Sequence, residues 1–309
     1  MLMISKSFEI NEDNINKRLD IFLTENLDGL SRGIVQKYIL LEQVIVNKAG
    51  SNKDYKLKFG DFIEVNIAPQ QNNEDEAQEI DLETVFENKN FIVINKPAGL
   101  TVHPGAGQKD KTLINGLIFK YPKLRSVERY GLVHRLDKDT SGLLLIARNQ
   151  RAHSVITEMI QNRTISRSYK ALVHGVPISG GTIDKPIGRH PTNRLIFCVK
   201  EGGRESITHF TVLKKFKNFS LLDISLETGR THQIRVHFKH KGYPIAGDKA
   251  YCKIKTWKDS NEKELSVINA LKRQALHAYR LEFVFDKEAF SFHSDMPQDI
   301  EDCISLIQK

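Results

Sequence analysis

One segment of this chain has almost no apolar side chains, so it cannot contribute to a hydrophobic core. It spans Pro69 to Gln78, reads PQQNNEDEAQ and shows neither helical nor strand periodicity. A polar, acidic stretch of this kind is typical of a solvated connection between folded units. We therefore predict two domains, residues 1–68 and 81–309, joined by an acidic linker over residues 69–80. A chain of 309 residues is long enough for both.

The part before the linker has the pattern of two helices followed by short strands. Apolar residues recur at helical spacing in 18–23 and in 34–41, and strand-like alternation follows in 44–48 and 60–65. This ααβ order resembles the S4 RNA-binding domain. The segments that carry the resemblance are Leu30-Ser31-Arg32, Val44-Ile45-Val46-Asn47 and Gly60-Asp61.

The S4 resemblance implies RNA contacts at three basic residues. Arg32, Lys37 and Lys48 lie where this kind of domain binds phosphates. The alternative is that all three are solvated surface charges. Because residues 1–68 sum to a net charge of −1, an RNA-binding surface on this domain must be a local patch.

The part after the linker mixes strand-like and helical segments without a regular strand–helix–strand rhythm. Short apolar runs predict strands, and one segment has helical spacing. The predicted strands are 91–95, 143–147, 169–173 and 220–226, and the predicted helix is 152–160. This mixture favours an α+β domain with a large mixed sheet over a doubly wound parallel sheet.

Positive charge is concentrated in the large domain. The chain carries a net charge of +8, of which residues 69–90 contribute −6 and residues 91–309 contribute +15. Such an excess suits a polyanionic partner, and the large domain is where a phosphate backbone would be bound. A basic enzyme with a well-solvated surface would have the same charge.

Cysteine spacing and hydropathy indicate the compartment. Cys198, Cys252 and Cys303 form no CxxC pair, so we expect neither a disulfide framework nor a zinc finger, and a reducing compartment fits. The N-terminus lacks the apolar stretch of a signal peptide. All apolar runs are far shorter than the ~20 residues of a membrane span. We expect a cytoplasmic protein, monomeric and without membrane contact.

Several common catalytic motifs are absent from the sequence. Residues 105–112 nearly match a phosphate-binding loop, but Asp110 replaces its second glycine. No GxGxxG follows a strand. His232 and His237 are five residues apart with no glutamate between them, which does not suit a zinc-binding helix. We therefore expect no nucleotide cofactor and no metal.

The remaining motif whose residues could carry out a reaction is GLVHRLDKDTSGLLL at residues 131–145. Asp137 lies in a polar loop between two apolar segments, close to Arg135 and Lys138. Nearby cations keep a carboxylate ionised and so able to act as a nucleophile or base. Taken alone, the loop could equally be a structural turn held by salt bridges.

The ordered motifs around this loop resemble the pseudouridine synthases that modify large-subunit ribosomal RNA and some transfer RNAs. The matching segments, besides His134-Arg135-Leu136-Asp137-Lys138-Asp139-Thr140-Ser141-Gly142, are Asn95-Lys96-Pro97-Ala98-Gly99, Val102-His103-Pro104-Gly105, Thr112-Leu113-Ile114-Asn115, Ser168-Tyr169-Lys170-Ala171-Leu172-Val173, Pro186-Ile187-Gly188-Arg189-His190-Pro191, 228–237, Pro244-Ile245-Ala246-Gly247-Asp248 and Leu276-His277-Ala278. With the S4-like domain, the resemblance covers almost the whole chain. Residues 103–107 and 273–278 resemble the D-type subgroup of these enzymes.

The resemblance implies the chemistry and the site. The family cleaves the bond between uracil N1 and ribose C1′, turns the base and rejoins it through C5, without a cofactor. Asp137 matches the catalytic carboxylate, which could attack C1′, add to the ring or take a proton from C2′. Tyr169 matches the active-site tyrosine, and Arg230 the arginine that pairs with the aspartate. Arg135 is expected to fill the gap left by the flipped nucleotide, and His134 to contact the RNA.

These observations favour site-specific uridine isomerisation in large-subunit ribosomal RNA. The D-type resemblance implies an intersubunit-bridge hairpin as the target. Two alternatives stay open. One is a transfer-RNA-directed enzyme of the same family. The other is a non-catalytic RNA-binding assembly factor, although such a protein would have no need of Asp137, Tyr169 and Arg230 together.

Overall fold

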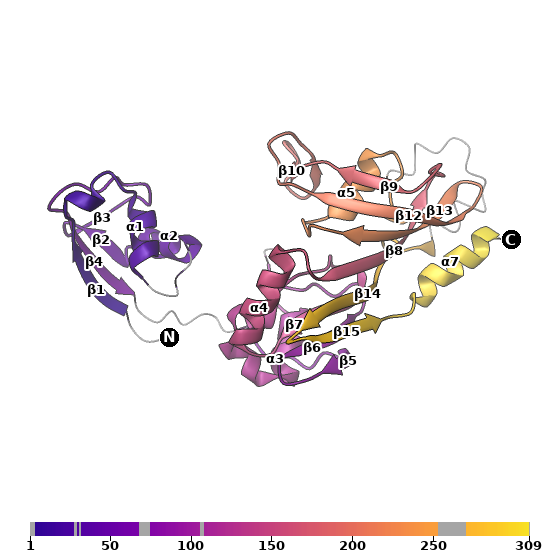
Figure 1. Cartoon of the computed structure of the whole chain (residues 1–309), viewed down its shortest axis with the longest axis horizontal. Helices are drawn as coiled ribbons and strands as arrows, with labels where there is room; N and C mark the ends of the chain where they lie inside the picture. Colours follow the sequence, from indigo (N-terminus) through magenta and orange to yellow (C-terminus); the bar gives the residue numbers. More distant parts are fainter. Residues whose placement is uncertain are drawn as a thin grey trace. The chain divides into compact units, whose positions relative to one another are not determined.

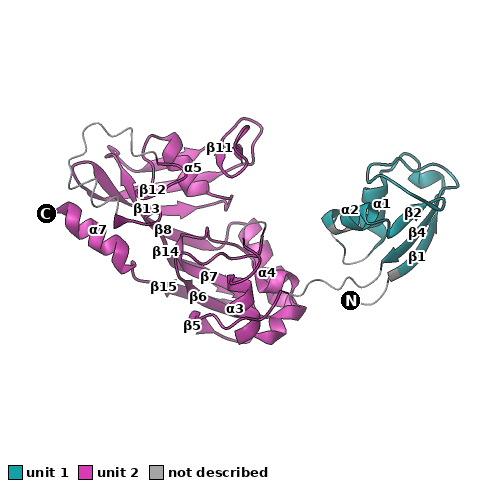
Figure 2. Ribbon diagram, turned by 180° about the vertical axis from the view of Figure 1, so that it is seen from behind, with its two compact units in different colours: residues 1–74 teal, residues 75–309 magenta. Residues whose placement is uncertain are grey.

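The chain consists of two compact units, residues 1–74 and 75–309 (Figure 2). The computed structural model describes residues 4–27, 30, 32–67, 75–105, 108–252 and 270–308. The unit boundary lies within the predicted linker, of which residues 69–74 are outside the described ranges. The prediction that residues 75–80 belong to the linker was wrong, because these residues are attached to the second unit. The backbone N–H of Gln78 donates to the Asn115 carbonyl at 3.1 Å, and the Asn115 amide donates to the Glu76 carbonyl at 2.7 Å.

The first unit packs two helices against a small antiparallel sheet (Figure 1). Its sheet has the order β1-β4-β2-β3, and its core consists of the buried apolar residues of both helices and of β2 and β4. The elements are β1 (Ile4–Glu9), α1 (Leu19–Asn26), α2 (Arg32–Leu40), β2 (Val44–Val46), β3 (Ala49–Gly50) and β4 (Phe62–Ile67), with a 3₁₀ turn at Glu12–Asn14. Strand β1 was not predicted, because most of its side chains are exposed and its sequence has little apolar alternation.

A buried carboxylate joins the two helices of the first unit. Asp20 in α1 is fully buried and accepts hydrogen bonds from Arg18 at 3.0 Å, Arg32 at 3.0 Å and Gln36 at 2.7 Å. Arg32, a predicted phosphate contact, is therefore engaged in holding α2 to α1. The other two predicted contacts, Lys37 and Lys48, are exposed.

The second unit is built on a nine-stranded mixed sheet, which confirms the α+β prediction. The strand order is β5-β6-β7-β14-β8-β13-β12-β9, with β15 paired to β14. Only the β7–β14 pair in this sheet is parallel among the described strands. The elements are β5 (Glu83–Glu87), β6 (Phe91–Lys96), α3 (Leu113–Lys120), β7 (Ser141–Ala147), α4 (Gln150–Gln161), β8 (Ser166–His174), β9 (Gly181–Asp184), β10 (Ile187–Arg189), β11 (Phe197–Val199), β12 (Ile207–Lys215), β13 (Phe219–Leu226), α5 (Gln233–His240), β14 (Leu276–Phe285), β15 (Glu288–His293) and α7 (Gln298–Gln308).

Helices cover both faces of this sheet. On one face, α3 and α5 pack against alternate residues of β6, β7 and β8. On the other face, α4 packs against β6 and β7, and α7 packs against β8 and β13. Strand β7 is consequently buried along its whole length, which explains its continuous apolar sequence. Strands β10 and β11 form a separate two-stranded hairpin.

None of the described helices is long and apolar enough to cross a lipid bilayer.

The buried Asp20 generates a pH-dependent stability in the first unit. Burial acts to raise the pKa of this carboxyl, but hydrogen bonds from Arg18, Gln36 and Arg32 lower it from 3.8 to about 2. A depressed carboxyl pKa contributes stability that is present above pH ~4 and is lost as the pH falls through about 2. We expect Asp20→Asn to destabilise this unit by about 1–2 kcal/mol at neutral pH and to weaken its pH dependence between pH ~4 and ~2.

The measurement is an acid titration of the full chain followed by the NMR amide resonances of residues 4–67. Glu25→Gln is the control, because Glu25 forms an exposed ion pair with Lys17 and such pairs contribute little. An acid transition of the Asp20 variant that coincides with that of the wild type contradicts the prediction.

Candidate active site

The loop that carries Asp137 is bound by a buried lysine at the end of strand β6. Lys96, at the end of β6, is fully buried, and its ammonium group donates to the carbonyls of Pro97 at 2.8 Å, Leu100 at 3.0 Å and Lys138 at 3.0 Å. These three acceptors satisfy its three N–H groups. The Gly99 amide also donates to the Lys138 carbonyl. The residue next to Asp137 is therefore anchored to the sheet.

The end of the same loop requires a glycine where β7 meets β14. Gly142 has a φ of +116°, and a Cβ at this position would lie 2.2 Å from the Ala278 carbonyl oxygen. Only glycine allows this backbone conformation and this close approach. The serine–glycine end of the His-Arg-Leu-Asp motif thus places Asp137 just before the parallel β7–β14 pair, at the centre of the sheet.

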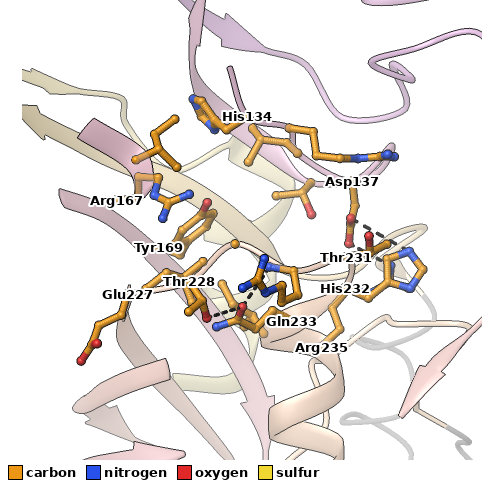
Figure 3. Close-up of a pocket in the computed structure, with 18 of the residues that line it drawn as sticks. His134, Asp137, Arg167, Tyr169, Glu227, Thr228, Thr231, His232, Gln233 and Arg235 are labelled. Atoms are coloured by element: carbon orange, nitrogen blue, oxygen red, sulfur yellow. Dashed lines mark hydrogen bonds and ion pairs between the residues drawn. The ribbon is translucent and has the colours of Figure 1, made fainter. Parts of the chain in front are cut away.

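Asp137 is paired with an arginine from helix α5. The Arg235 Nη1 donates to Asp137 Oδ2 at 3.0 Å (Figure 3). The same guanidinium binds Asp248 through two hydrogen bonds of 2.6 and 2.9 Å. The exposed fraction of the side chain is 16% for Asp137, 9% for Arg235 and 0% for Asp248. Asp248 holds Arg235, and Arg235 in turn orients Asp137, which is the more exposed of its two carboxylate partners.

The predicted pairing of Arg230 with Asp137 was therefore wrong. Arg230 lies in the loop between β13 and α5, where its Nε donates to the Glu205 carbonyl at 3.0 Å. Its backbone N–H donates to the side chain of Gln233, which in turn binds Ile207 in β12. Helix α5 begins only at Gln233, so Arg235 in its first turn faces Asp137, whereas Arg230 lies at the rim of the pocket.

A histidine approaches the other carboxylate oxygen. The Nε2 of His232 lies 4.0 Å from Asp137 Oδ1, and its Nδ1 lies 2.7 Å from the Tyr251 hydroxyl. That hydroxyl accepts a hydrogen bond from the Phe197 backbone N–H in β11, so its own proton has His232 Nδ1 as its acceptor among the described residues. With the hydroxyl donating to Nδ1, the imidazole hydrogen is assigned to Nε2. Burial lowers the pKa of His232, so the ring presents a neutral N–H to Asp137.

Asp137 opens into a cavity of about 480 Å³. Tyr169 in β8 is buried in its wall, and burial together with the Asp137 charge raises the pKa of its hydroxyl, which therefore remains a hydrogen-bond donor at neutral pH. The charged residues that line the cavity are Arg129, Arg135, Asp137, Arg163, Arg167, Glu205, Glu227, Arg230 and Arg235. Arginines outnumber carboxylates, as expected for a site that binds a polyanion. No three His, Cys, Asp or Glu side chains in the described ranges are arranged to hold a metal ion.

The structure brings the other predicted site residues to the same cavity with different surroundings. Arg135 is exposed at the rim. His134 is held in the fold, because its Nε2 accepts the Leu145 backbone N–H at 3.0 Å. Burial lowers the pKa of His134 to about 3, so its imidazole is neutral. Its buried Nδ1 has no partner among the described residues.

Comparison with known proteins agrees with the residues around this cavity. A model of the RNA pseudouridylate synthase family matches residues 90–240. Ribosomal large subunit pseudouridine synthase D of Haemophilus ducreyi is 39% identical over 304 residues, covering 97% of this chain and 94% of that protein. The protein of the same name from Escherichia coli K12 is 38% identical over 303 residues, covering 97% and 93%.

The chain belongs to the RNA pseudouridine synthases. This confirms the predicted family and the predicted enzyme class, an isomerase that converts uridine to pseudouridine in RNA. Human RNA pseudouridylate synthase domain containing 1 superimposes with a TM-score of 0.57 at 27% identity, covering 72% of this chain and 87% of that one. Human RNA pseudouridylate synthase domain containing 4 has the same fold, with a TM-score of 0.59 at 23% identity over 73% and 93% of the two chains.

Sequence reasoning missed four residues of the synthase's site besides Arg235. Asp248 ends the matching segment Pro244-Ile245-Ala246-Gly247-Asp248 but was given no role, and Tyr251 follows three residues later without a signal that links it to Asp137. His232 was considered only as a metal ligand. Arg167 lies two residues before Tyr169, and the period of a strand places both on one face, so it could have been found from that spacing.

Because Arg235 is bound by two carboxylates, Asp248→Asn should lower both the stability and the activity of the enzyme. Removing one partner of a buried charge pair costs about 3–5 kcal/mol, and in this variant Arg235 would keep only the partly exposed Asp137 as a counter-charge. We expect the free energy of unfolding to fall by about that amount, and kcat to fall at least 10-fold, because Arg235 no longer holds Asp137.

Unfolding in urea and single-turnover isomerisation measure the two effects. The matched control is Asp286→Asn, whose carboxylate forms an exposed ion pair with Arg151 and should cost less than about 1 kcal/mol. Equal stabilities of the two variants would show that the Asp248 pair is not structural.

Tyr251→Phe tests whether the Tyr251 hydroxyl fixes the hydrogen of the His232 imidazole on Nε2. The substitution removes one hydroxyl and leaves the Phe197 N–H and His232 Nδ1 without it, so the ring hydrogen is no longer fixed on Nε2. The loss of a hydrogen bond of ordinary net strength predicts a kcat about 3- to 10-fold lower with little change in KM. The tautomer is read from the ¹⁵N shifts of the ring, and the rate from tritium release, since isomerisation expels the hydrogen at C5 of uracil. The prediction fails if both the tautomer and the rate are those of the wild type.

Proposed function

We propose that this synthase isomerises uridines in large-subunit ribosomal RNA, with Asp137 as the catalytic carboxylate. The observation that carries the assignment of the residue is its environment. Asp137 is fixed by Arg235 on one oxygen, faces the His232 N–H with the other, and opens into a cavity large enough for a nucleotide. Support for the substrate comes from the relatives named ribosomal large subunit pseudouridine synthase D, which match along nearly the whole chain.

The reaction needs one carboxylate and a held base. The C1′–N1 bond breaks, the uracil rotates, and a C1′–C5 bond forms; the hydrogen on C5 leaves and N1 gains one, so no atom is lost overall. Glycosidases use a second carboxyl group to protonate a leaving group that departs. Here the uracil stays in the cavity, so Asp137 alone is chemically sufficient. Neither redox nor phosphoryl-transfer chemistry is part of this balance.

Each of the other residues has a role in this proposal. Tyr169 stacks on the target base and places its protonated hydroxyl against it. Extruding a base from a hairpin costs a few kcal/mol. The exposed Arg135 at the rim offsets part of this cost by occupying the space that the base leaves. His134 supports the loop from inside the fold.

The first unit is proposed as an accessory RNA-binding domain of S4 type. Lys37 and Lys48 are exposed and would contact phosphates, and Arg32 holds α2 to α1 through Asp20. Its near-neutral composition suits a weak, shape-directed contact with structured RNA. We further propose a cytoplasmic monomer that acts on an intersubunit-bridge hairpin, as the D-type resemblance implies.

Mapping pseudouridines in cells tests the function. In a deletion strain, carbodiimide labelling and reverse transcription of large-subunit ribosomal RNA should show the loss of specific pseudouridines. Wild-type enzyme should restore them and Asp137→Asn should not, because an amide cannot act as nucleophile or base. Asp139→Asn, in the same loop, is the control and should restore them.

Three results would contradict the proposal in different ways. If the deletion loses marks only in transfer RNA, the substrate is wrong. If it loses none, the protein acts as a binding factor. If Asp137→Asn restores the marks, the catalytic residue lies elsewhere.

A further inference from the structure

A second arginine of the cavity is buried and has no partner among the residues that the structure describes. Arg167 is the second residue of β8, with 6% of its surface exposed. Its guanidinium makes no hydrogen bond or ion pair with any of the described residues, and its buried Nε is unsatisfied. Figure 3 shows this side chain in the wall of the cavity, next to Tyr169 from the same face of the strand.

An unpaired buried guanidinium destabilises the free enzyme. Taking a charge out of water costs several kcal/mol unless hydrogen bonds and an opposite charge compensate. The other buried arginine of the cavity, Arg235, is compensated by two carboxylates. The half-exposed Arg163 is paired with Glu205 and Glu227. Arg167 has neither kind of compensation, which indicates that its partner arrives with the substrate.

The carboxylates of the cavity are already occupied. Asp137 is bound by Arg235, and both glutamates are bound by Arg163. The backbone also leaves room for the guanidinium itself, since a Cβ on Gly229 would lie 2.9 Å from Arg167 Nη1. Arg167 is therefore held against the loop between β13 and α5, with its donors directed to the cavity instead of to protein.

The position of Arg167 along β8 indicates which part of a bound nucleotide it contacts. It follows the exposed Ser166 at the start of β8, whereas Tyr169 lies further along the strand. Gln161 and Arg163, which come shortly before β8, are exposed and also line the cavity, so we take this end of β8 to lie at its mouth. A flipped base enters first and its ribose phosphate remains toward the mouth. A guanidinium fork matches two phosphate oxygens.

We propose that Arg167 pairs with a backbone phosphate of the RNA strand that delivers the target uridine into the cavity. The inference rests on the proposed function, because it assumes that RNA enters this cavity. The contact repays the desolvation of Arg167 only in the complex. It therefore adds to affinity and holds the strand while Asp137 acts on C1′.

Salt-dependent RNA binding tests the contact. The probe is in vitro transcribed large-subunit ribosomal RNA, with affinity measured over a range of KCl concentrations for wild type, Arg167→Gln, Arg167→Lys and Arg151→Gln. Each lost phosphate contact reduces the slope of log K against log salt by about 1. We expect Arg167→Gln to show this reduction and affinity about 10-fold weaker at low salt. Arg167→Lys should keep the slope. Arg151→Gln removes the same charge from α4 outside the cavity and should match the wild type.

Thermal unfolding separates this role from a structural one. Because no described side chain or carbonyl pairs with Arg167, Arg167→Gln should have a Tm equal to or above that of the wild type. A lower Tm with an unchanged salt slope identifies a structural residue and overturns the proposal. So does a reduced kcat with the wild-type slope, which would identify a base contact. RNA binding can be measured without turnover. If the wild type binds this RNA but forms no pseudouridine, the proposed function is refuted. The slope of log K against log salt still decides whether Arg167 contacts a phosphate.

Discussion

The geometry of the site depends on one buried guanidinium shared between two carboxylates. Arg235 is buried by the packing of α5 against the sheet, and such a charge is tolerated only because Asp248 binds it through both ends of its fork. The remaining Nη1 donor then fixes Asp137. Stability and reactivity are separated in this arrangement: the fully buried Asp248 provides the compensation, and the more exposed Asp137 remains accessible to substrate.

A second constraint acts on the backbone that carries Asp137. Lys96 binds the Lys138 carbonyl of the loop together with the carbonyls of Pro97 and Leu100, and Gly142 packs closely against Ala278 of β14, so the loop is restrained at both of its ends. The charges that would meet RNA belong instead to side chains that differ in their freedom. Arg135 is exposed at the rim, Arg163 is paired on the protein, and Arg167 is buried and unpaired. The large positive charge of this part of the chain is thus distributed between residues that shape the site and residues available to the substrate.

The sequence was sufficient for the family, the two-unit organisation and the central strands, because long apolar runs and ordered motifs are local signals. It failed where the outcome depends on tertiary contacts. Arg230 and Arg235 are five residues apart in one motif, and only the start of α5 after the left-handed His232 decides which of them faces Asp137. Residues 76–80 look like linker, yet they pair with α3. The missing partner of Arg167 has no signature in composition or spacing, since it is a property of the folded surroundings.

The hydrogen bond from Phe197 to Tyr251 joins two parts of the molecule that differ in local stability. Phe197 belongs to the short β10–β11 hairpin, which pairs over only three residues and lies outside the main sheet, whereas His232 and Asp137 are attached to that sheet. A small hairpin of this kind opens at a lower free energy than the global unfolding of its domain. An opening of the hairpin would release the Tyr251 hydroxyl and with it the orientation of the His232 ring. Arg235 would still hold Asp137, so the imidazole and the carboxylate are organised by separate parts of the fold.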